Sequence, residues 1–163
     1  MFRIYCVETE EDVRDALALL KEYVESLGFD LDFQDFENEL AEYPGEYAPP
    51  EGCILLVRDL EGEAVGCVSL RPLEPGVCEM KRMYVVPGVR GRGLGRALAM
   101  GLIDQARRMG YRKMRLDTLA SLEAANELYR SLGFEEIGPY RHNPFDDAVF
   151  MELEIPERKG EED

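Results

Sequence analysis

Residues 79–98, EMKRMYVVPGVRGRGLGRAL, join a predicted strand to a predicted helix through a turn rich in glycine. The apolar stretch before the turn has strand character, and the pattern after it predicts an amphipathic helix over 93–109. Gly91, Gly93 and Gly95 leave no Cβ between the backbone and an approaching ligand. The first turn of a helix also offers unpaired N–H groups and the positive end of the helix dipole. The segment therefore predicts a site for a phosphate or pyrophosphate group.

Positive charge is concentrated in the same part of the chain. The 163 residues carry a net charge of −15, but the stretch from Lys81 to Arg115 holds ten basic residues and one acid, a charge of +9. The remainder, with nine basic and 33 acidic residues, carries −24. This asymmetry favours an anionic ligand, although a solvated basic face is the alternative. The arginines around the glycines are Arg90, Arg92 and Arg96.

Two well-known nucleotide-binding motifs do not fit the turn. A P-loop requires Gly-Lys followed by Ser or Thr, and no such pair follows these glycines. The dinucleotide fingerprint beginning at Gly91 requires a glycine at position 96, which is arginine. The remaining alternative to an anion site is a turn that needs glycine only for its positive φ angles.

The rest of the chain alternates strand and helix patterns. Strands are predicted over 2–7, 53–58, 64–70, 77–86, 113–119, 134–140 and 148–155, and helices over 10–27, 33–42, 93–109 and 122–132. This order predicts a mixed α/β fold, one twisted sheet of about seven strands flanked by about four helices with a central β-α-β unit. We expect a single domain over 1–155 and a frayed tail over 156–163.

The segment around the turn resembles the GNAT superfamily of acyl-CoA N-acyltransferases. Its motif, Q/R-x-x-G-x-G/A after a Leu-Tyr-Val-like strand end and a proline, reads here as Arg90-x-x-Gly93-x-Gly95 after MYVVP at 83–87. Downstream, ANELYRSLGF at 125–134 is similar to a second signature of that family, A-x-x-x-Y-x-x-x-G-F. The predicted order of elements matches the family fold from residue 2 to about 155.

This resemblance implies a cofactor site and a catalytic tyrosine. Acetyl-CoA would be the co-substrate, lying in a gap where two strands splay apart, and no metal is implied. The tyrosine would protonate the departing thiolate, although a tyrosine that only packs on the core is the alternative. The cofactor-binding residues implied are Met83, Tyr84, Val85, Arg90, Gly91, Arg92, Gly93, Leu94, Gly95, Arg96 and Asn126, and the general acid is Tyr129.

The base that deprotonates the amine is less defined. Glu79 lies where lysine-modifying family members place their catalytic glutamate, so the resemblance makes it a candidate. The alternatives are a chain of water molecules and a surface carboxylate paired with Lys81. His142, the sole histidine, lies in a predicted loop and is not expected to act.

The acyl acceptor is expected to be a primary amine, of a small molecule or a protein. The acidic region 30–50 and the loop 140–147 are the expected substrate loops. Acidic walls suit a cationic amine, with plain solubility as the favoured alternative, whereas Arg71 and Arg82 suit an acceptor with a carboxylate. The resemblance implies direct attack in a ternary complex, and a homodimer is possible for such domains.

Other classes of protein fit less well. A non-catalytic acyl-CoA-binding module of the same fold would not require Tyr129 or Glu79. A nucleic-acid partner is disfavoured by the negative charge outside the central segment. No apolar run reaches membrane-spanning length and no secretion signal is visible. Four separate cysteines and one histidine form no zinc motif and suit the cytoplasm.

Overall fold

The computed structural model describes residues 1–27 and 36–157. The strands are β1 (Arg3–Cys6), β2 (Cys53–Arg58), β3 (Ala64–Glu74), β4 (Val77–Val85), β5 (Lys113–Leu119), β6 (Glu135–Ile137) and β7 (Ala148–Glu154). The helices are α1 (Glu10–Leu27), α2 (Phe36–Glu42), α3 (Leu94–Arg108) and α4 (Glu123–Ser131), with short 3₁₀ turns η2 (Gly45–Tyr47) and η3 (Pro87–Val89). None of these helices is long and apolar enough to cross a membrane.

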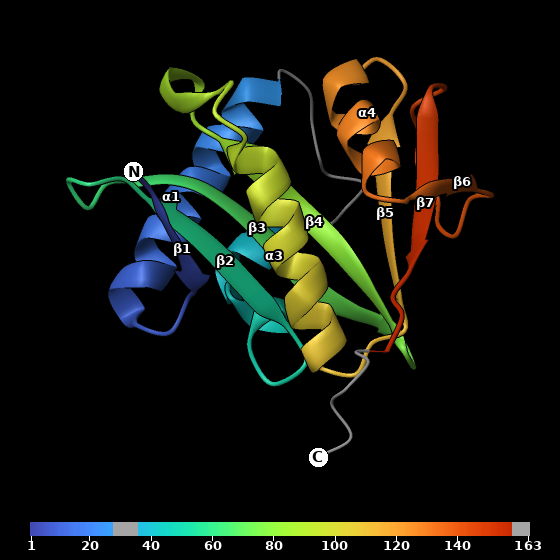
Figure 1. Ribbon diagram of the computed structural model, residues 1–163, viewed down its shortest axis with the longest axis horizontal. Helices are drawn as coiled ribbons and strands as arrows, with labels where there is room; N and C mark the ends of the chain where they lie inside the picture. The colour runs from blue at the N-terminus through green and yellow to red at the C-terminus, as the bar shows by residue number, and fades with distance from the viewer. Residues whose placement is uncertain (28–35, 158–163) are drawn as a thin grey trace.

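All seven strands form one sheet in the order β1-β2-β3-β4-β5-β7-β6 (Figure 1). Every neighbouring pair is antiparallel except β4 and β5, which are parallel and joined through α3. A parallel pair requires such a crossover. The predicted mixed α/β sheet with its central β-α-β unit is therefore confirmed.

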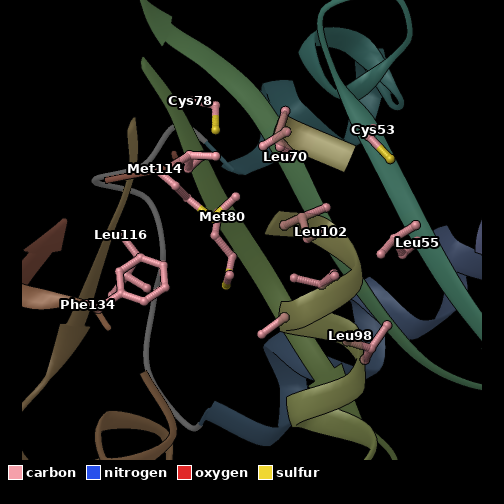
Figure 2. Packing of buried hydrophobic residues seen from close by; sticks show 14 of the residues in the cluster. Cys53, Leu55, Leu70, Cys78, Met80, Leu98, Leu102, Met114, Leu116 and Phe134 are labelled. Carbon is pink, nitrogen blue, oxygen red and sulfur yellow. The ribbon is translucent and has the colours of Figure 1, made fainter. Parts of the chain in front are cut away.

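Helices cover both faces of the sheet. In β2, Leu55 and Val57 belong to the apolar cluster that contains α3, while Ile54 and Leu56 belong to the cluster that contains α1. Because alternate strand residues point to opposite faces, α1 and α3 lie on opposite sides. Figure 2 shows the α3 side, where leucines of the helix point toward β2, β3 and β4.

Local sequence signals account for where most of the helices and strands begin and end. Thr9 caps α1, because its Oγ1 accepts a hydrogen bond of 3.0 Å from the Asp12 N–H. Two predicted strands differ in length: β3 continues to Glu74, and β6 covers only three residues. Gly138-Pro139 follows β6 directly, and a proline has no N–H to continue a ladder. The first residues of the predicted helix 33–42 and most of the predicted tail lie outside the described residues.

A bulge in β4 separates it from β5. Cys67 of β3 pairs with Tyr84 and Ser69 pairs with Lys81, so β4 carries one extra residue between these pairs. Arg82 lies within the bulge with φ of 60°, a left-handed conformation that is uncommon for a residue with a side chain. On its other edge, β4 pairs with β5 only from Val77 to Glu79. The two strands then diverge toward the amino end of α3.

The leucines on the buried face of α3 should contribute strongly to the free energy of unfolding. Leu102 is fully buried against the strands, whereas Met100 of the same helix is 53% exposed. We expect Leu102→Ala to lower the free energy of unfolding by about 2–5 kcal/mol, since it leaves a cavity. Met100→Ala should change it by less than about 0.5 kcal/mol. Urea unfolding followed by circular dichroism measures both, and equal losses would contradict the assigned packing.

Candidate active site

A cavity of about 590 Å³ lies where β4 and β5 separate. Its walls come from both diverging strands, the turn before α3 and the face of α4. Of the residues predicted from sequence, it is lined by Met83, Tyr84, Val85, Arg90, Gly91, Gly93, Leu94, Gly95 and Tyr129. Arg92, Arg96, Asn126 and Glu79 do not line it.

The glycine turn leaves its backbone open. Gly91 and Gly93 have φ of 83° and 77°, and a Cβ built on either would meet nothing within 4 Å. Gly93 is the N-cap of α3, and its carbonyl accepts the first helical hydrogen bond, from Ala97. The N–H groups of the three preceding helical residues therefore have no partner within the helix. Open space above unpaired amides at a helix N-terminus is the geometry of an anion site.

The three predicted arginines behave differently. Arg90 lines the cavity, and its Nε donates a hydrogen bond of 2.8 Å to the Val85 carbonyl. Arg96 donates to Ser131 Oγ at 2.5 Å and so ties α3 to α4. Arg92 is exposed. Thus one arginine faces the cavity, one holds two helices together, and one adds charge from the surface.

Helix α4 presents Tyr129 to the cavity and directs Asn126 elsewhere. The Tyr129 ring packs edge-on against Phe134 at 5.8 Å between centroids. Burial raises the pKa of its hydroxyl, which therefore keeps its proton at neutral pH. Asn126 is buried, and its Nδ2 donates to the Leu119 carbonyl at 2.9 Å. Its Oδ1 accepts no hydrogen bond from any residue in the described part of the chain.

Glu79 is fully buried in a cluster of hydrogen-bond donors. Its Oε1 accepts a hydrogen bond from Arg71 Nε at 2.9 Å, and its Oε2 accepts one from the Tyr140 hydroxyl at 2.5 Å and forms an ion pair with Arg141 Nη2 at 2.5 Å. Burial alone would raise the pKa of Glu79, but the charges of Lys81, Arg141 and Arg71 and the Tyr140 hydrogen bond outweigh it. The pKa is held below its usual value, which makes this carboxylate a weak proton acceptor.

Comparison with known proteins identifies this architecture. The family model described as Acetyltransferase (GNAT) family matches residues 12–134. The chain belongs to this family. An uncharacterized N-acetyltransferase of Schizosaccharomyces pombe is 44% identical over 153 residues, 93% of this chain and 94% of that protein. The N-acetylaspartate synthetase of Xenopus tropicalis is 37% identical over 98 residues, 60% of this chain and 36% of that protein. A GNAT-family acetyltransferase structure from Staphylococcus aureus has the same fold, with a TM-score of 0.78 and 19% identity over 96% of this chain and 100% of that one.

As a GNAT enzyme, the chain is an N-acyltransferase of a family that uses acyl-CoA. Its own residues fit such a co-substrate at the glycine turn. The open space over Gly91 and Gly93 lets a pyrophosphate approach the unpaired amides there. Among the described residues, no group of three or more His, Cys, Asp or Glu side chains is arranged to hold a metal ion.

The sequence analysis missed two charged residues within this GNAT site. Lys81 and Asp117 line the cavity, and their side chains are each only 4% exposed. Burial lowers the pKa of Lys81 to about 8, against the opposing effect of Glu79. In KMRLDTL, Asp117 shares the face of Lys113 and Arg115, whereas the buried positions are Met114, Leu116 and Thr118, so the local pattern gave no signal for it. Arg71 and Arg82, the predicted carboxylate ligands, instead pair with Glu79 and Glu39 respectively.

The Glu79 cluster should make stability depend on acidity. Since the pKa of Glu79 in the folded chain lies below its ordinary value of 4.5, its contribution is complete above that pH and is lost as pH falls through the folded pKa. We expect Glu79→Gln to lower the free energy of unfolding by about 3 kcal/mol at neutral pH, because two half-buried arginines lose a fully buried counter-charge.

The difference between wild type and Glu79→Gln should shrink between neutral pH and about pH 3, because below 4.5 the unfolded wild-type chain takes up a proton that the folded carboxylate resists. Urea unfolding at both pH values measures it. Glu136→Gln, at an exposed position of β6, is the matched control and should change stability little at either pH. A loss that stays the same at both pH values would contradict the ionised cluster.

Proposed function

We propose that the chain transfers an acetyl group from acetyl-CoA to a primary amine by direct attack in a ternary complex. The observation that carries this proposal is one cavity lined at once by the open glycine turn, the diverging edge of β4 and Tyr129. An anion site, a channel for an extended arm and a proton donor are the three elements that such a transfer requires.

The co-substrate would be held mainly by backbone groups. The amides of residues 91–96, with Arg90, suit the pyrophosphate, and residues 83–85 suit the pantetheine arm. The Val85 carbonyl already accepts from Arg90, and its second lone pair remains for another donor. The bound thioester supplies an activated acetyl carbonyl.

The reaction is a simple exchange of bonds. The amine nitrogen attacks the carbonyl carbon, the new C–N bond forms, and the C–S bond breaks with the electron pair leaving on sulfur. The Tyr129 hydroxyl, which keeps its proton at neutral pH because burial raises its pKa, donates that proton to the thiolate. Among the described residues, no cysteine lines the cavity, which supports direct attack over an acyl-enzyme.

Water suits the role of base better than Glu79 does. The Glu79 oxygens accept hydrogen bonds from an arginine and a tyrosine and pair with a second arginine, and the pKa of this carboxylate is lowered. We therefore assign Glu79 to holding the loop that carries Tyr140 and Arg141. The proton released by the amine would leave through water in the open cavity.

The competing function is a non-catalytic acyl-CoA-binding module. Such a module has no need for a protonated tyrosine facing the cavity, so the position of Tyr129 favours the enzyme. We place the activity in the cytoplasm, in keeping with four free thiols. The relative named N-acetylaspartate synthetase supports an amino acid as one class of acceptor.

Two glycines at opposite ends of α3 allow a matched test of the anion site. Gly93 and Gly110 have φ of 77° and 93°, and a Cβ on either meets nothing within 4 Å. Alanine at each position should therefore cost a similar stability, about 1–2 kcal/mol. We expect only Gly93→Ala to weaken acetyl-CoA binding, by about tenfold or more, because its Cβ enters the space of the phosphates. Calorimetric titration with acetyl-CoA measures this, and equal affinities would refute the anion site.

Removal of the Tyr129 hydroxyl should slow the chemical step without weakening the binding of acetyl-CoA. We expect Tyr129→Phe to lower kcat by about 100-fold while the Kd for acetyl-CoA changes less than about twofold. Tyr111→Phe is the matched control, since the Tyr111 hydroxyl bonds to the Glu51 carbonyl outside the cavity. Thiol release from acetyl-CoA with a saturating amine measures kcat. A variant that loses affinity and keeps kcat would make Tyr129 a packing residue.

A further inference from the structure

Lys81 and Asp117 occupy equivalent places on the two diverging strands. The last pair between β4 and β5 is Glu79 with Arg115, and each of the two residues lies two positions beyond its member of that pair. Alternation along a strand returns them to the same face of the sheet. Their charged atoms, Lys81 Nζ and Asp117 Oδ1, are 3.7 Å apart. The two walls of the cavity thus carry opposite charges near the point where the strands part.

This pair is poorly explained as a stabilising feature. The distance of 3.7 Å is longer than a good hydrogen bond, so the attraction comes without the short contact that best offsets desolvation. Both side chains are nonetheless almost fully buried, and Asn143 Nδ2 lies 3.3 Å from the other Asp117 oxygen. In proteins, replacement of a buried ion pair by apolar residues of similar volume is often neutral or stabilising. The arrangement is better suited to meeting a ligand that carries both charges.

The charge of the cavity favours an acceptor with a carboxylate. Its charged lining residues in the described chain are three cations and one anion: Lys81, Arg82, Arg90 and Asp117. Glu39, which pairs with Arg82, and Glu46, which pairs with Arg71, are not among its lining residues. The acidic positions 30, 32 and 35 lie outside the described residues. Because Glu39 neutralises Arg82 and Arg90 lies at the anion site, Lys81 and Asp117 are the described charges left to meet the acceptor, and the two together match an amine with a carboxylate better than a polyamine.

We propose that Lys81 and Asp117 form the acceptor subsite, and that its substrate class is an amino acid, an amine with a carboxylate nearby. Lys81 would donate to the carboxylate, and Asp117 would accept a hydrogen bond from the amine and orient it toward the thioester. The inference rests on the proposed transferase function. With a pKa of about 8, Lys81 is still mainly charged at neutral pH. Asn143 holds the aspartate in place from the loop before β7.

The first experiment requires no variant. Thiol release from acetyl-CoA is measured with each amino acid that occurs in proteins and with the corresponding carboxamide as acceptors. Putrescine and spermidine are tested as polyamine acceptors. The two members of a pair have nearly the same shape; the carboxamide lacks the negative charge, and the lower pKa of its amine works against the expected preference for the acid. We expect the free acid to be preferred in kcat/KM by about 10- to 100-fold for the best acceptor, the worth of one charge-assisted hydrogen bond.

The second experiment removes the cation. Lys81→Met should lower kcat/KM for the best acid by a similar factor and change that for its carboxamide less than about threefold, with the Kd for acetyl-CoA nearly unchanged. Lys113→Met is the matched control, because Lys113 lies on β5 outside the cavity with a side chain 41% exposed. Its kcat/KM values should equal those of the wild type. Equal losses for the acid and the carboxamide would overturn the assignment of Lys81.

These experiments distinguish a wrong assignment of the acceptor subsite from a wrong assignment of the transferase function. Turnover of polyamines or carboxamides in preference to acids would overturn the subsite and leave the acetyl transfer intact. Binding of acetyl-CoA with no turnover of any amine would overturn the transferase function and the subsite with it. The acid preference of the wild type remains informative even if a Lys81 variant does not fold.

Discussion

The parting of β4 from β5 after three paired residues is the constraint on which the site depends. The bulge at Arg82 bends β4 away from its parallel neighbour while β4 remains paired with β3. Strand β5 keeps its full register with β7, so it cannot follow. The cavity, the open edge of β4 and the position of the glycine turn all result from this divergence. Without the bulge, two parallel strands would close the space.

Charged side chains on β4 then connect the site to the surrounding elements. Glu79 meets donors from β3 and the loop before β7, Arg82 binds Glu39 of α2, and Lys81 faces Asp117 of β5. A buried charge is tolerated only beside a partner, so each contact fixes a different neighbour against the strand. The same few residues that shape the cavity therefore also hold its walls. These contacts explain how the sheet stays well packed around a cavity of this size.

The local parts of this arrangement were predictable from sequence. The glycine turn, the helix after it and the tyrosine of the second signature are encoded within short stretches, and the structure places Gly93 and Tyr129 on one cavity. The partners of Glu79 were not predictable, because Tyr140 and Arg141 lie more than 60 residues away along the chain. The resemblance also implied a cofactor role for Asn126, whose side chain bonds to the Leu119 backbone. Lys81 and Asp117 become neighbours only through the β4–β5 register, which no local pattern specifies.

The brief pairing of β4 with β5 also divides the sheet into two hydrogen-bonded units. Strands β1 to β4 form one, and β5, β7 and β6 form the other, with the seam between them limited to Val77–Glu79. Apolar packing crosses this seam, but beyond Glu79 no backbone ladder does so in the described chain. A molecule that bridges the gap supplies the missing connection. When such a molecule binds only the folded chain, its binding free energy adds to the stability of that chain by mass action. Occupancy of the site therefore also stabilises the contact between the two units of the sheet.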